Sequence, residues 1–290
     1  MKLILITTQS DLEENNRIAE EARKLGYDFE LQDLKKFEFG IIDGKIDTVN
    51  YSAEGGDIII IRGVFNSIKA ISAHIEGLRM KGVKVFDNNF LIHKYSINKL
   101  ADMLKLAHAR LNVPDLYHVH AFDNYPKYAE RLGFPVILKL TRTGKGAGVY
   151  KLNSMEELKN FIERVDELGV EAKTYLIQKY IPYKFDLRIL IIGSNVYTMR
   201  RIPKEGEFRA NFSLGGSVEL YDLDLEGEIL ARRALEAVGL KVGGVDMLIA
   251  ADGKRYILEV NHTPGMLGME KATGKNITRN YLDYAIAKAV

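Results

Sequence analysis

Cysteine is absent from the 290 residues of this chain, and so is tryptophan. Without cysteine there is no disulfide framework, no thiolate nucleophile and no thiolate metal site. The chain also lacks any apolar run as long as a membrane span, although 47% of its residues are hydrophobic. Residues 1–8 are too short a stretch for a secretory signal and are typical of a first strand. We therefore expect a cytoplasmic protein without a membrane partner.

An excess of charge of one sign is also missing, because 41 Lys and Arg stand against 39 Asp and Glu and give a net charge of +2. The sequence has no block of basic residues of the kind that binds nucleic acid, so we expect no nucleic-acid partner. Its length is sufficient for two or three units, each with its own core.

Strand-like and helix-like patterns alternate over residues 1–93. Apolar strands are expected at 3–8, 57–61 and 84–86, and helices at 11–25 and 66–80. This alternation predicts a small open α/β sheet. No G-x-G-x-x-G follows the first strand, so a dinucleotide is not indicated. Residues 1–93 are therefore expected to form the first domain.

Two further units are expected after it, one over residues 94–181 and one over residues 182–290. The first begins with a helix capped by Ser96 and continues as a mixture of strands and helices. The second has longer strands, a helix near 225–238 and two terminal helical stretches. The fold class is therefore α/β, with α+β character in the C-terminal part.

A hairpin at residues 243–261 has the strongest chemical signal. Asp252-Gly253 is a strong turn signal between two apolar strands. The first strand carries Asp246, and the second carries Glu259 and Asn261, which lie two residues apart and hence on one face. Antiparallel pairing can bring these three oxygen ligands together, which is the chemistry that Mg²⁺ prefers. Edge carboxylates that simply face water are the alternative interpretation.

A glycine-rich connection at residues 141–148 indicates phosphate binding. Gly144, Gly146 and Gly148 permit close backbone approach and free N–H donors facing an anion. This is not a Walker loop, because a strand follows it, and a lid over nucleotide phosphates fits better. Lys139 ends the preceding apolar strand, where burial would be costly unless the lysine meets an anion. Lys99 is a second candidate for the same role.

Arginines inside apolar strands are usually paired with a carboxylate or a phosphate. Arg188 and Arg201 occupy such positions on neighbouring strands, and Arg209 and Asn211 follow them shortly before a glycine pair.

The order of these motifs resembles the ATP-grasp superfamily, and in particular its RimK-like branch of amino-acid ligases. The matching segments are Lys99, Lys139 with its glycine loop, 178–181, 186–188, 208–211, 243–246 and 259–265. Residues 90–290 carry the resemblance, and residues 1–90 match as the preceding small α/β domain. The run 265–274 resembles the glutamate ligases of this branch. The resemblance therefore implies an ATP-grasp fold with an N-terminal pre-ATP-grasp domain.

The resemblance implies a role for each matching position. ATP would be bound by the group Lys99, Lys139, Gly144, Gly146, Gly148, Lys179, Tyr180, Asp186, Arg209 and Asn211. Magnesium, with Mn²⁺ as an alternative ion, would be bound by Asp246, Glu259 and Asn261. Arg188 and Arg201 would stabilise an acyl phosphate. The family commonly has Glu where this chain has Lys179, so adenine recognition there is expected through the backbone. His262 is not counted as a base, because a histidine after a metal ligand is more often positional.

The implied activity is an ADP-forming carboxylate–amine ligase. We rank first an α-L-glutamate ligase that acts on an acidic protein tail or a coenzyme. Second is a LysX-type ligase that joins an amino acid to an acidic carrier protein, and third is a catalytically silent nucleotide-binding module. A homo-oligomer is expected.

The acceptor should be anionic and lie between the first sheet and the glycine pair Gly215-Gly216. Arg62 ends the most apolar strand of the first domain, where open α/β sheets present ligand groups. Asn66 and Ser67 follow at the start of a helix, whose free N–H groups favour an anion. The alternative is that Arg62 pairs with a structural carboxylate.

Overall fold

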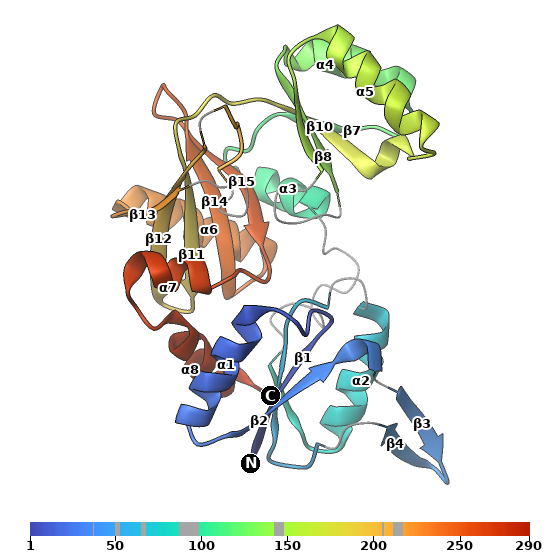
Figure 1. The fold of residues 1–290 in the computed structure, drawn as a ribbon, viewed down its shortest axis with the longest axis vertical. Helices are drawn as coiled ribbons and strands as arrows, with labels where there is room; N and C mark the ends of the chain where they lie inside the picture. Colours follow the sequence, from blue (N-terminus) through green and yellow to red (C-terminus); the bar gives the residue numbers. More distant parts are fainter. Residues whose placement is uncertain are drawn as a thin grey trace.

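The computed structural model describes residues 1–36, 38–49, 53–64, 68–86, 99–141, 148–204, 206–210 and 217–290. They form three lobes, named along the chain the N-terminal, middle and C-terminal domains, and the C-terminal domain lies between the other two in space (Figure 1). Among these residues, no helix has both the length and the apolar character needed to cross a bilayer.

The N-terminal domain is a parallel sheet in the order β2-β1-β5-β6, as the alternating pattern predicts. Its strands are β1 (Lys2–Thr7), β2 (Asp28–Asp33), β5 (Ile58–Ile61) and β6 (Lys84–Phe86). Its helices are α1 (Glu13–Lys24) and α2 (Ile68–Met80). A separate hairpin, β3 (Glu38–Ile42) with β4 (Lys45–Val49), extends from it and is not among the expected elements, although its turn, Asp43-Gly44, is an Asp-Gly pair.

The middle domain is an antiparallel sheet in the order β7-β10-β8-β9 with α4 and α5 on one face. Its elements are β7 (Leu116–His118), α4 (Tyr125–Leu132), β8 (Val136–Leu140), β9 (Val149–Leu152), α5 (Met155–Glu167) and β10 (Tyr175–Lys179). Helix α5 is capped by Ser154, whose Oγ accepts a hydrogen bond from the Glu157 N–H at 3.2 Å.

The C-terminal domain is an antiparallel sheet in the order β13-β12-β11-β14-β15. Its elements are β11 (Asp186–Ile192), β12 (Asn195–Ile202), β13 (Ser217–Leu220), α6 (Leu225–Val238), β14 (Val242–Ile249), β15 (Arg255–Asn261) and α7 (Leu267–Thr273). Helix α6 covers one face through Ala231, Ala234 and Leu235, which pack against Leu187 and Ile189. The predicted hairpin of β14 and β15 is present, with an irregularity after Asp246.

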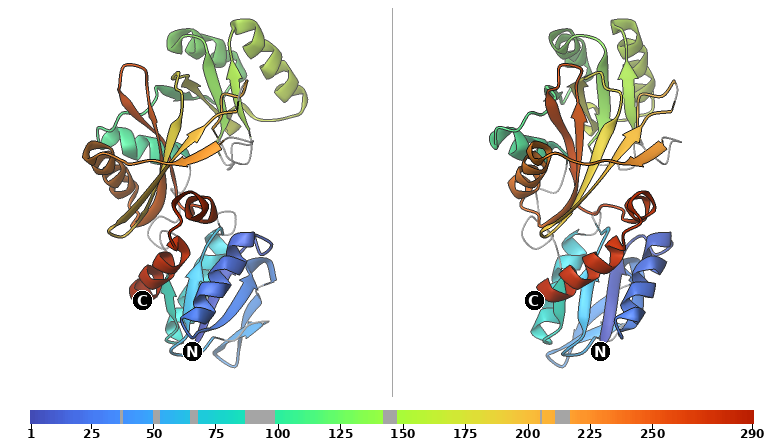
Figure 2. Two further views of the ribbon diagram at one scale, coloured as in Figure 1. Left: turned by 60° about the vertical axis from the view of Figure 1, so that its left-hand side comes forward. Right: turned by 90° about the vertical axis from the view of Figure 1, so that its left-hand side faces the viewer.

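Two helices lie away from the domain that their place in the chain suggests. Helix α3 (Lys99–His108) packs against β15 and α6 of the C-terminal domain rather than on the middle sheet. Helix α8 (Ile277–Lys288) lies against α1 of the N-terminal domain (Figure 2). Tyr281 and Leu282 of α8 share one apolar cluster with Leu3 and Leu5 of β1. Helices α3 and α8 thus pack across the expected boundaries at 93 and 181, which stay predictions.

Candidate active site

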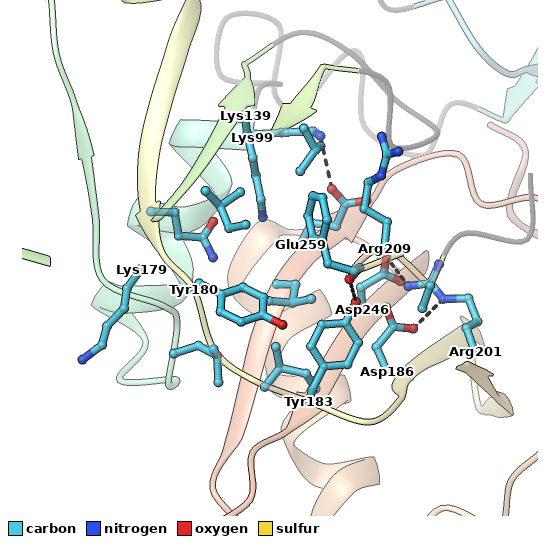
Figure 3. Close-up of a pocket in the computed structure, with 18 residues that line it drawn as sticks. Lys99, Lys139, Lys179, Tyr180, Tyr183, Asp186, Arg201, Arg209, Asp246 and Glu259 are labelled. Carbon is cyan, nitrogen blue, oxygen red and sulfur yellow. Dashed lines mark hydrogen bonds and ion pairs between the residues drawn. The ribbon is translucent and has the colours of Figure 1, made fainter. Parts of the chain in front are cut away.

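A cleft lies between the middle sheet and the C-terminal sheet, and it gathers most of the charged residues singled out in the sequence (Figure 3). Its polar lining comprises Lys99, Lys139, Gln178, Lys179, Tyr180, Tyr183, Asp186, Arg201, Arg209, Asp246 and Glu259. Its apolar lining comprises Ile137, Val149, Ile181, Phe208, Ala210, Leu248 and Leu258. A cleft that combines apolar side chains with charged groups suits a ligand with a flat ring and phosphates.

The period of two along β11 explains how charged residues reach this cleft. Leu187 and Ile189 face α6 and belong to the core of the C-terminal domain. On the other face, Asp186 and Arg188 are followed by Leu190, which is buried beneath the C-terminal helices. One strand face therefore changes from charged at the cleft to apolar under the helices.

Arg201 lies between two buried carboxylates at the floor of the cleft. Its Nε donates to Asp186 Oδ1 at 2.6 Å, and its Nη2 lies 2.9 Å from Asp246 Oδ2. Arg188 donates from its Nη2 to Asp246 Oδ2 at 2.7 Å. This alternation of charges is the pairing expected for arginines in apolar strands. Arg188 and Arg201 are brought together through Asp246.

These pairings set the charge state of the two carboxylates. Burial alone would raise the pKa of Asp246, but Arg188 and Arg201 outweigh it and hold that pKa at about 2. Burial raises the pKa of Asp186 to about 6 in spite of its bond to Arg201. Asp246 is therefore the carboxylate that stays ionised over the whole neutral range.

The pairing register places the predicted metal ligands on one face of the hairpin. Asp246 is opposite Glu259, and Gly244 is opposite Asn261. Among the described residues no three His, Asp or Glu side chains cluster for a metal. Two carboxylates that line the cleft nevertheless fit Mg²⁺, which usually takes one or two carboxylates and completes its shell with phosphate oxygens and water. Asn261 lies outside the lining, and its Oδ1 accepts from the Thr263 N–H at 3.0 Å.

Two lysines face these carboxylates from different elements. Lys99, the first residue of α3, has its Nζ 3.3 Å from Glu259 Oε2. Lys139 reaches the cleft from β8, because its neighbours Val136 and Leu138 face the core of the middle domain. Burial lowers the pKa of Lys139 to about 8, although Glu259 acts to raise it. A half-buried ammonium is costly without a counter-charge, so Lys139 suits an anionic ligand.

The link from β10 to β11 forms the side wall of the cleft. Lys179 is exposed, and its side chain points away from the charged cluster (Figure 3). Tyr183 donates its hydroxyl to the Phe208 carbonyl at 2.7 Å and so ties this link to the 206–210 loop. Arg209 of that loop pairs with Glu207, with Nη2 and Oε2 2.7 Å apart. Contacts of Arg209 and Tyr180 with a nucleotide stay predictions.

Arg62 is placed away from this cleft. It is buried, and its Nη2 donates to Glu14 Oε1 at 3.1 Å and to the Pro264 carbonyl at 2.9 Å. The guanidinium also lies over the Tyr281 ring, 4.9 Å from its centroid. Arg62 thus joins the N-terminal domain to the segment after β15, and Glu14 is a structural carboxylate partner of the kind that the alternative interpretation expects.

Several predicted site residues lie outside the described residues. They are Asn66, Ser67, Gly144, Gly146, Asn211, Gly215 and Gly216. Gly148 is described: it has a φ of 70°, and a Cβ there would collide with the Leu140 side chain. Glycine is therefore required at this end of the predicted loop.

The sequence interpretation missed three features of the site. Gln178 faces the cleft on β10, and the alternation of that strand could have shown it. Tyr183 lies in an irregular link with no periodic signal. The third is the buried contact of His262 with Asp102, two residues that lie 160 positions apart in the chain.

The fold and the charged cleft define an ATP-dependent ligase of the ATP-grasp class. The model of the RimK-like ATP-grasp domain matches residues 96–285, and the chain belongs to this family. It is also similar to a protein of Nitrosococcus oceani named probable alpha-L-glutamate ligase. The two are 30% identical over 98% of this chain and 95% of that protein.

Solved structures of low identity share the fold over almost the whole chain. A RimK domain ATP-grasp protein from Sphaerobacter thermophilus is 17% identical, with a TM-score of 0.73 over 98% of this chain and 99% of its own. The ATP-grasp ligase PsnB, complexed with minimal precursor, Mg and ADP, is 18% identical, with a TM-score of 0.69 over 98% and 97% of the two chains. The predicted fold class and family are confirmed.

Proposed function

We propose that this protein is an α-L-glutamate ligase that forms an amide between the amino group of L-glutamate and a carboxylate of an acidic, peptide-like acceptor. The observation that carries the proposal is the cleft that sets Lys99 and Lys139 opposite Asp246 and Glu259. The relatives named probable alpha-L-glutamate ligase support the choice of amino acid. PsnB, solved with a minimal precursor, supports a peptide-like acceptor.

The proposed reaction needs no protein nucleophile. An acceptor carboxylate oxygen attacks the γ-phosphorus of ATP, and ADP leaves with the bond electrons. The glutamate nitrogen then attacks the acyl carbon, phosphate leaves, and the nitrogen loses a proton. Positioning and charge neutralisation are the main requirements of both steps.

The residues of the cleft divide these requirements. Lys99 and Lys139 would neutralise phosphate oxygens, and Arg188 and Arg201 would stabilise the acyl phosphate. Both arginines form ion pairs with Asp246 in this structure. To stabilise the acyl phosphate, they have to contact it as well as Asp246. The carboxylates Asp246 and Glu259, with Asn261, would hold Mg²⁺, which supplies charge neutralisation at the phosphates.

A substrate matrix tests the proposal. ADP release is measured for each of the twenty amino acids, with and without a peptide that ends in glutamates, and the products are weighed by mass spectrometry. We expect release that requires both L-glutamate and the acidic peptide, with a mass gain of one glutamate residue. Release that requires a different amino acid and an acidic carrier protein would favour the LysX-type alternative. ATP binding without turnover under every condition would leave only the nucleotide-binding module.

A further inference from the structure

Asp102 and His262 form a buried hydrogen bond behind the cleft. The Nε2 of His262 lies 2.7 Å from Asp102 Oδ2. Because an ionised carboxylate only accepts hydrogen bonds, the ring nitrogen donates. Asp102 is 5% exposed and His262 is 9% exposed, and neither lines the cleft. The pair is therefore shielded from both solvent and any ligand of the cleft.

This pair is the inner of two contacts that α3 makes with β15 and with the residue that follows β15. Lys99 and Asp102 are three residues apart in α3 and hence lie on one face. Lys99 meets Glu259 inside the cleft, where their side chains are 24% and 33% exposed. Asp102 meets His262, three residues further along the chain, with side chains 7% and 6% exposed. Only the inner contact is withdrawn from the cleft.

The outer contact cannot hold the helix during ligand binding. If Lys99 binds a phosphate and Glu259 binds a cation, the ion pair between the two is weakened. The hydrogen bond between Asp102 and His262 is unaffected, because neither residue lines the cleft. It is also directional, and hydrogen bonds to an ionised group in a low-dielectric interior are among the stronger ones.

We propose that Asp102 and His262 are positioning residues that hold the first turn of α3 at the distance from β15 at which Lys99 reaches a bound nucleotide. The inference rests on the proposed use of Lys99 and Glu259 at the nucleotide. Because Asp102 is buried, its carboxylate depends on His262. Among the described residues nothing donates a hydrogen bond to its other carboxylate oxygen. Removing the histidine strands a buried carboxylate.

A double-mutant cycle distinguishes positioning from simple stabilisation. ADP affinity is measured by calorimetry, with and without Mg²⁺, for Asp102→Leu in the parent and in Lys99→Met. We expect Asp102→Leu to weaken ADP binding about tenfold in the parent. In Lys99→Met it should weaken ADP binding no further, because displacement of the first turn of α3 affects ADP only through Lys99. The drop in melting temperature should be equal in both backgrounds.

Asp102→Asn is the matched control, because its amide oxygen can still accept from His262. It should retain most of the ADP affinity that Asp102→Leu loses. If Asp102→Leu does not fold, the same cycle is run with His262→Gln, whose amide can still donate to Asp102 from a different position. An equal loss of affinity in both backgrounds, or a loss of melting temperature alone, would overturn the proposal. ADP binding does not depend on ligation, so a protein that binds ADP as expected but ligates nothing refutes the proposed function and leaves this inference intact.

Discussion

Lys139 should make nucleotide binding depend on pH in the alkaline range. Its pKa of about 8 lies low because burial disfavours the ammonium. A phosphate beside it would raise that pKa again, so binding takes up a proton above pH 8. The protonated fraction of the free protein falls about tenfold for each pH unit above the pKa. The affinity for ADP should fall with it, until the loss reaches the value of one charged hydrogen bond, about 1.5–3 kcal/mol.

Calorimetric titration with ADP in chelator, from pH 7 to 10, measures this directly in the metal-free state. Lys139→Met should bind more weakly at pH 7 and show a flat profile, whereas Lys139→Arg should stay tight and flat, because its guanidinium does not titrate there. Lys179→Met is the charge-matched control, since Lys179 points away from the charged cluster. It should keep the parental profile. A parental curve without a break between pH 8 and 9 would refute the placement of Lys139 at the phosphates.

The same lysine should lower stability. A fall in pKa from 10.5 to about 8 means that folding disfavours the charged form, by about 3 kcal/mol at most. Below pH 8 Lys139 is charged in both the folded and the unfolded protein, so the full loss in free energy of unfolding is present. As the pH rises from 8 toward 10.5, the folded protein gives up this proton first, and the loss disappears. Lys139→Met should therefore melt higher than the parent at pH 7, and the two should converge by pH 10.5.

Four further substitutions test other parts of the molecule. Glu259→Gln should lower turnover at millimolar Mg²⁺ while leaving the melting temperature almost unchanged. Asp246→Asn should lower turnover as well, and it should lower the free energy of unfolding by about 3 kcal/mol, because Arg188 loses a buried partner. Full activity in either variant would remove that residue from the metal site. Arg62→Met should lower the free energy of unfolding in urea by about 3 kcal/mol. A raised KM for the acidic acceptor at unchanged ADP affinity would give Arg62 the predicted acceptor role as well. A loss of stability alone would mean that Arg62 is structural. Gly244→Ala should impair turnover more than folding, because a Cβ there would lie 3.4 Å from Arg188 Cδ and 3.1 Å from the Pro264 Cβ; unchanged kcat would show that Arg188 has room to adjust.

The sequence predicts the sheets well because their signals are local. The alternation in the N-terminal domain and the Asp252-Gly253 hairpin both depend on neighbours a few residues apart. The hairpin of β3 and β4 has the same kind of local signal, the Asp-Gly turn at Asp43-Gly44, and could have been predicted in the same way. The attachment of α3 and α8 depends on contacts between distant segments, which no local period reports.

The candidate site divides in the same way. Asp246, Glu259, Lys139 and Arg201 stand out because a charge inside an apolar strand is costly without a partner. Their register could be deduced, but their partners could not: Arg201 bridges two carboxylates because β12, β11 and β14 are adjacent in the sheet. The contact of Arg62 with the Pro264 carbonyl joins residues 202 positions apart, so no local pattern reports it, and the acceptor role of Arg62 stays a prediction.

The attachment of α8 has a consequence for how the chain acquires its structure during synthesis. Val290 exchanges two backbone hydrogen bonds with Val85 at the edge of β6, at 2.9 and 3.2 Å, and Tyr281 and Leu282 cover the apolar side chains of β1. Helix α8 is synthesised after the middle and C-terminal sheets, although it covers a sheet that precedes both of them. A nascent chain that stops short of α8 therefore leaves part of the apolar face of this sheet uncovered, and non-local closure of this kind is slow. The cover of the N-terminal sheet is thus completed only after the two other sheets have been synthesised.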